Sequence, residues 1–202
     1  MKLAKVTAGH WKDSGDDAGF SRRYQFADDC REKSKIAIGF MFDEGTPLDA
    51  NTTTADIREL GTTDLKAMYE KEGVKEGKAK NAAEQIIRFR DWPAGTPLFL
   101  YLGRNTVDSI GYLKGSYEYE WDGHFHDEYG YPHVREIEWI DVPRKFSRSE
   151  LPDDFQGWLT NPQTALDYTV SPRSEEADFL ALSRGIGKAL DGLGEGELSI
   201  LR

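Results

Sequence analysis

The chain is poor in several features that mark large protein classes. It has one cysteine, Cys30, in 202 residues, which excludes an internal disulfide and a metal cluster built from several cysteines. It has no apolar run near the roughly 18 residues that cross a bilayer. Its first residues, MKLAKVTAGHWKD, lack the apolar core of a secretory signal. These absences predict a soluble cytoplasmic protein with no membrane partner.

A basic excess is also missing. The net charge of −10 counts against a protein that coats nucleic acid through bulk electrostatics. The charge is uneven, because Lys and Arg outnumber acids in 71–104, whereas 118–128 carries acids and neither Lys nor Arg. A local basic strip is compatible with holding a few phosphates. Ordinary solvated faces are the alternative explanation of both runs.

The residues that are present suit a globular protein. Hydrophobic residues make up 38% and aromatic residues 12% of the chain, which argues against disorder. The length allows one well-cored domain with an appendage, or two very small domains.

Hydrophobic alternation and turn residues predict a β-rich middle of the chain. The predicted strands are 2–8, 36–42, 97–102, 107–119 and 134–142. The long strand is expected to bulge near Gly111 or Gly115, because glycine inside a strand often marks a bend.

Helical spacing of apolar residues predicts the other elements. We expect a helix within 9–34 and another over 56–72 that is interrupted near Gly61. A third helix is expected over 81–91, with Asn81 as its N-cap and Pro93 ending it. A charged loop is predicted over 71–80 and an irregular loop over 122–132. Two short helical pieces are expected after Pro143, followed by an amphipathic helix over 175–193.

Two stretches carry a family resemblance. Residues 81–142, with WPAG after a helix and the ending YPHVREIEWIDV, together with IAIGF at 36–40, resemble the EVE-like barrels of the PUA superfamily. They are similar to the amino-terminal specificity domains of McrB-type restriction proteins. The resemblance implies an α+β, PUA-like fold: a small curved or closed β-barrel of five or six strands flanked by helices. It places this domain at 1–170, with 171–202 as a C-terminal helical extension or linker.

The resemblance also implies a base-binding site. An I-x-I-G-aromatic strand commonly places a large ring beside the pocket, and this chain has Phe where many relatives carry Trp. The candidate base-binding residues are Trp11, Phe40, Asp43, Trp92, Asn105 and Tyr119. Flat rings stack on an extruded base, and Asp or Asn can read its hydrogen-bonding edge. The alternatives are core packing for the rings, with Trp92 stapling the 81–91 helix to the barrel, and turn formation for Asp43 and Asn105.

Arginines in the same segments are candidate phosphate ligands because guanidinium groups bind phosphate in a bidentate manner. They are Arg88, Arg104 and Arg135, with Arg90 beside them. The alternative is structural ion pairing, for example between Arg88 and Glu84 four residues earlier.

Catalysis and metal binding are weakly indicated. His124, His126 and His133 lie near several acids, but their spacing matches no zinc signature and no cysteine is near. No nucleophile elbow or dinucleotide loop is present. We therefore expect a non-enzyme without metal or cofactor, a small hydrolase or metal enzyme on 122–133 being a rival.

Together these expectations predict non-catalytic recognition of modified, methylated bases, in DNA rather than RNA, within a modification-dependent restriction or defence system. A nuclease or motor subunit is a further expected partner. The alternatives are an RNA-binding reader, or a PUA-like protein-interaction module with a degraded pocket.

Overall fold

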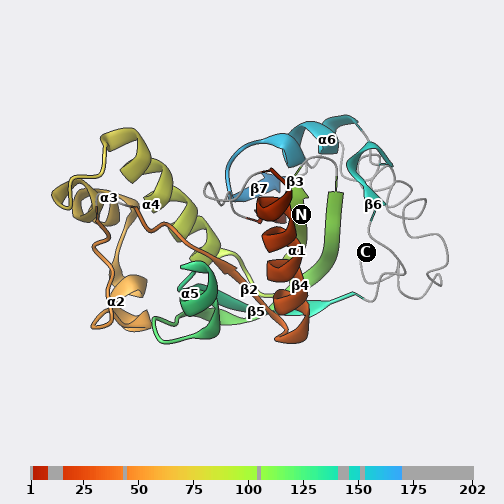
Figure 1. Ribbon diagram of the computed structural model, residues 1–202. Coiled ribbons are helices and arrows are strands. Elements are labelled where there is room, and N and C mark those ends of the chain that lie inside the picture. The colour runs from red at the N-terminus through yellow and green to blue at the C-terminus, as the bar shows by residue number, and fades with distance from the viewer. Residues whose placement is uncertain are drawn as a thin grey trace.

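The protein is an α+β structure built around one mixed β-sheet (Figure 1). The computed structural model describes residues 2–8, 16–42, 45–103, 106–140, 146–150 and 153–169. The strands are β1 (Lys2–Thr7), β2 (Lys35–Ile38), β3 (Pro97–Gly103), β4 (Thr106–Tyr119), β5 (His133–Trp139), β6 (Phe146–Ser147) and β7 (Ala165–Thr169). The predicted α+β class is therefore confirmed.

The strands follow one another in the order β2-β5-β4-β3-β1-β7, and β6 pairs with the start of β4. Only the β1–β3 pair is parallel among the described pairs, with Ala4 opposite Leu98. Since β2 and β7 form the two ends of this path, the described sheet is open. The prediction allowed a curved or a closed barrel. These strands do not make the closed barrel.

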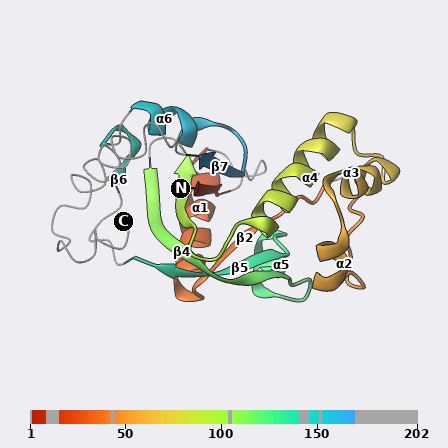
Figure 2. The same cartoon turned by 180° about the vertical axis from the view of Figure 1, so that it is seen from behind.

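Strand β4 connects the two halves of the molecule, as its long bend shows (Figures 1 and 2). Its first half pairs with β3, and its second half pairs with β5. The β4–β5 register shifts between Leu113 and Tyr117, which surround Gly115. The bulge predicted near Gly111 or Gly115 is thus found at Gly115, where it turns the strand.

The helices are α1 (Asp16–Glu32), α2 (Thr54–Glu59), α3 (Thr62–Lys71), α4 (Glu76–Asp91), α5 (His124–Tyr129) and α6 (Asp153–Thr160), with a short 3-10 turn η1 (Arg148–Glu150). Helices α2, α3 and α4 gather at one end of the sheet, on the far side from β6 and α6 (Figure 1). The predicted interruption near Gly61 is confirmed, because α2 ends and α3 begins there. None of the described helices is long and apolar enough to cross a bilayer.

Three predictions about loops and a helix cap are wrong. The segment 71–80 is not all loop, and Asn81 is not a cap, because α4 already begins at Glu76 and buries Ala79, Ala82 and Ala83. The loop 122–132 contains α5, which buries Phe125 and Tyr129.

The second helical piece expected after Pro143 is a strand. β7 pairs along the free edge of β1, with Leu3 opposite Tyr168. The expected helix at 175–193 and the whole extension 171–202 lie outside the described residues.

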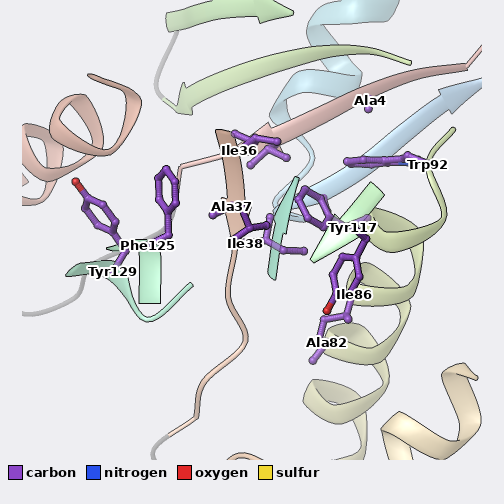
Figure 3. Close-up of a cluster of buried hydrophobic side chains, with 14 of the residues drawn as sticks. Ala4, Ile36, Ala37, Ile38, Ala82, Ile86, Trp92, Tyr117, Phe125 and Tyr129 are labelled. Carbon is purple, nitrogen blue, oxygen red and sulfur yellow. The ribbon is translucent and has the colours of Figure 1, made fainter. Parts of the chain in front are cut away.

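The main core lies between α4, β2, β4 and β5. Figure 3 shows Ile36 and Ile38 of β2 close to Tyr117 of β4 and Ile86 of α4. All four side chains are buried. This packing brings the C-terminal end of α4 to the bulge of β4, and the candidate site forms there.

Candidate nucleic-acid interface

A cleft of about 690 Å³ opens where α2, the end of α4, the β4 bulge and β5 meet. This volume lies in the range of small-molecule and cofactor sites. The lining residues are Arg58, Arg90, Asp91, Trp92, Ala94, Lys114, Gly115, Ser116, Tyr117 and Arg135. Two residues predicted from the sequence, Trp92 for base binding and Arg135 for phosphate binding, thus come together here.

Arg135 forms part of the cleft floor and is only 3% exposed. Its Nη1 donates to the backbone oxygens of Phe89 and Trp92, and its Nη2 donates to the oxygen of Gly115 at 2.7 Å. The guanidinium therefore caps the last carbonyls of α4, where a helix attracts positive charge. Burial lowers the pKa of Arg135.

Trp92 is also 3% exposed, and its ring meets Phe89 edge-on with centroids 5.6 Å apart. This contact joins the end of α4 to the core, as the stapling alternative proposed. The buried Nε1 of Trp92 and Nε of Arg135 find no acceptor among the described residues. An unsatisfied buried donor costs about 1–3 kcal/mol. These two N–H groups are donors of this kind.

The walls of the cleft are charged. Arg90 donates from Nη1 to the oxygens of Ile57 and Leu60, at 2.8 and 2.7 Å, and from Nε to Asp91 at 2.6 Å. Arg58 reaches across from α2 and donates from Nη2 to the oxygen of Tyr117 at 3.1 Å.

Lys114 on the bulge pairs with Glu138 of β5. With Arg58, Arg90 and Arg135 it completes a set of cations against one lining carboxylate, Asp91. Because the whole chain carries −10, the cleft is a local positive region on an acidic protein, and a low-dielectric cleft concentrates such a field.

Comparison with family models assigns this chain to a protein family. A model described as "Domain of unknown function (DUF8426)" matches residues 11–157. The chain belongs to the DUF8426 family. The match includes every residue of the cleft, from Arg58 to Arg135. Comparison with curated proteins and with solved structures returned no match.

Other predicted base-binding residues of this DUF8426 chain lie away from the cleft lining. Tyr119 is 8% exposed, its hydroxyl donates to the oxygen of Asp49 at 3.4 Å, and burial raises its pKa. Phe40 is half-buried just after β2, and its backbone oxygen accepts a hydrogen bond from Tyr69 at 2.9 Å. The neighbouring Met41 is 44% exposed, so the segment after β2 presents apolar surface to solvent.

Four predicted residues, Trp11, Asp43, Arg104 and Asn105, lie outside the described residues. Arg88 joins α4 to β7 by pairing with Asp167 at 3.0 Å and donating to the oxygen of Ala165 at 2.9 Å. The structural alternative named Glu84 as its partner, but the structure pairs Glu84 with Lys80 at 3.8 Å.

The three histidines have separate partners. His124 Nε2 lies 2.7 Å from an Asp29 oxygen, and His126 stacks on Trp121 with centroids 4.2 Å apart. His133 is buried, its Nδ1 lies 2.6 Å from the Tyr117 hydroxyl, and burial lowers its pKa to about 3. Within the described ranges, no group of three His, Cys, Asp or Glu side chains is placed to hold a metal ion.

Sequence reasoning missed Arg58 and Lys114 as site residues. Lys114 is adjacent to Gly115, so the predicted bulge was the available signal, since bulges often redirect side chains next to functional sites. Arg58 had no such signal, because only the packing of α2 against β4 brings it to the cleft.

Proposed function

We propose that this protein is a non-catalytic reader of a modified base in nucleic acid, with methylated DNA as the favoured ligand. The fold proposed for it is an open variant of the PUA-like scaffold that the sequence resembles. One observation carries the proposal. Trp92 and Arg135, 43 residues apart in the chain, meet on the floor of a cleft walled by Arg58, Arg90 and Lys114.

The physical case combines charge with ring surface. The cations attract a polyanion to one place on a protein that otherwise repels it. A base that leaves the stack loses a few kcal/mol of pairing and stacking, and stacking on an aromatic side chain recovers about 1–3 kcal/mol per base. Phe40, with Met41 exposed beside it, is the proposed base-contacting group, and the cleft is the proposed backbone contact. A nuclease or motor subunit would act on the DNA once the base is bound.

The test is a titration with matched oligonucleotides. Duplexes and single strands of one sequence would carry N6-methyladenine, 5-methylcytosine, 5-hydroxymethylcytosine or no modification, and anisotropy would report binding. We expect one modification to bind about tenfold tighter than the unmodified strand, equivalent to ~1.4 kcal/mol. Equal, weak binding to all of them at moderate salt rejects the proposal.

A protein-interaction module of the same fold is the second candidate. The burial of Trp92 and Tyr119, at 3% and 8% exposure, favours it, because these rings offer little free face. Phe40→Ala separates the two functions: it abolishes the modification preference of a reader but leaves partner binding intact in an interaction module. Tyr168→Ala, which removes another half-buried ring on β7, is the matched control.

A further inference from the structure

The cations of the cleft differ in the hydrogen bonds and ion pairs that they already form within the protein. Arg90 and Arg135 are committed to backbone carbonyls, and Arg90 also binds Asp91. Their charges are fixed in place in the cleft lining. They contribute electrostatic attraction without needing to move.

Arg58 and Lys114 are different. Arg58 is exposed, and the described residues give its side chain a single hydrogen bond, to the oxygen of Tyr117. Lys114 is 57% exposed, and its partner Glu138 is 60% exposed. An exposed ion pair of this kind is worth about 0–1 kcal/mol, so Lys114 can exchange Glu138 for a better anion.

The β4 bulge holds Lys114 at the cleft. The β4–β5 register shifts between Leu113 and Tyr117, and Ser116 from the same bulge also lines the cleft. At Gly115 the bulge passes close to the exposed Glu136, since a Cβ there would lie 2.7 Å from its carboxylate oxygen. Lys114 is therefore positioned by backbone geometry and not by its ion pair.

We propose that the cleft binds a backbone phosphodiester, and we call this binding site the seat. Arg58 and Lys114 bind the phosphate together with the fixed charges of Arg90 and Arg135. Glu138 competes with that phosphate for Lys114. The seat rests on the proposed function, because it assumes a nucleic-acid ligand. Phosphate suits the site: it offers several oxygen acceptors, and its charge matches a group of cations. Arg135 and Trp92, whose buried Nε–H and indole N–H lack acceptors among the described residues, both line the same cleft.

Glu138 makes the inference specific. If it competes with phosphate for Lys114, Glu138→Gln strengthens binding of an unmodified single strand several-fold, as measured by anisotropy on the full chain. Lys114→Gln and Arg58→Gln each weaken binding of this strand. Each also makes the negative slope of log K against log salt shallower by about 0.7. Lys71→Gln, which removes an exposed positive charge outside the cleft lining, is the control and changes affinity less than twofold.

The double variant Lys114→Gln/Glu138→Gln distinguishes competition from a general charge effect. Competition requires the gain from Glu138→Gln to disappear when Lys114 is absent. A gain that persists in the double variant overturns the competitor role. Lys114→Gln and Arg58→Gln variants that behave like Lys71→Gln overturn the seat. Thermal unfolding of every variant confirms that it is folded.

The same data separate this inference from the proposed function. Binding that depends on Lys114 and Arg58 but ignores base modification rejects the reader and supports the seat. A modification preference that is unaffected by these variants supports the reader and rejects the seat. If no strand binds, the reader is rejected, and the seat is tested with pyrophosphate alone. Stabilisation of the protein by pyrophosphate against thermal unfolding supports the seat if Lys114→Gln abolishes it. No stabilisation of the wild type overturns the seat.

Discussion

His133 illustrates how its surroundings can change a side chain that looks like a ligand in the sequence. It is enclosed next to Tyr117, with which it stacks at 5.9 Å between centroids and shares a 2.6 Å hydrogen bond. Its pKa is lowered to about 3 by burial, so the ring that shares this hydrogen bond with Tyr117 is neutral. A histidine held in this way is part of the core.

This burial predicts a pH dependence of stability. The unfolded state takes up a proton near pH 6.5, whereas the folded state resists until about pH 3. The stabilisation is therefore complete above pH 6.5 and falls as the pH drops, by about 1.4 kcal/mol per pH unit. Urea unfolding of the wild type and of His133→Gln, which retains an acceptor for Tyr117, measures it. Between pH 6.5 and 5 the wild type loses about 2 kcal/mol more than the variant; equal losses would contradict the assignment.

At the scale of elements, the end of β2 shows why the IAIGF segment stops being a strand. β2 ends at Ile38, and Gly39 lies against the turn that follows α5. A Cβ on Gly39 would lie 2.2 Å from the Gly130 oxygen and 2.4 Å from the Tyr131 ring. The close approach directs the chain toward α3, where the Phe42 ring meets Tyr69 at 5.6 Å.

Gly39→Ala therefore tests this contact. Because backbone atoms of the α5 turn must move, we expect a loss of about 2–3 kcal/mol in the free energy of unfolding, measured in urea. Gly77→Ala is the control: a Cβ there meets nothing within 4 Å, and alanine in a helix gains about 0.5 kcal/mol over glycine. A Gly39→Ala variant as stable as the wild type would show that the turn yields easily.

At the scale of the whole molecule, charge limits how nucleic acid would bind under the proposed function. The chain carries −10 overall, and the described cation group is concentrated in one cleft. The protein is therefore expected to contact few phosphates and to be repelled elsewhere. Under the proposed function, such a protein would bind at one point and would not wrap the polymer.

The salt dependence of duplex binding measures this contact. With two or three phosphates engaged, log K should fall against log salt with a slope of about −2 to −3. A slope near −8 would require many more phosphate contacts and would contradict a single cleft. The experiment uses one unmodified duplex and anisotropy over a range of salt concentrations.

Much of the fold could be predicted from local sequence. Apolar residues predict β3 nearly to its ends and β5 nearly from its start, although β5 ends at Trp139, before the predicted end. Gly61 predicts the α2–α3 break, Pro93 the end of α4, and Gly115 the bulge. These features depend on backbone preferences of neighbouring residues, and the chain carries that information wherever it folds.

Other features depend on partners far away in the chain. Lys5 is a charged residue inside β1, yet its amine is buried and donates to the oxygens of Leu159 and Asn161 at the end of α6. Burial lowers its pKa to about 8. Neither this anchor nor the pairing of β7 with β1 has a local signal.

The candidate site belongs to this second group. The sequence by itself determined the α+β class, the segments that form β1 to β5 and the choice of arginines as candidate phosphate ligands. Tertiary structure decided that Arg88 is paired with Asp167 and that Arg135 caps α4. It also placed Arg58 and Lys114 at the cleft. The physical reason is that local patterns specify backbone conformation, whereas the partner of a long charged side chain is chosen only when distant elements pack together.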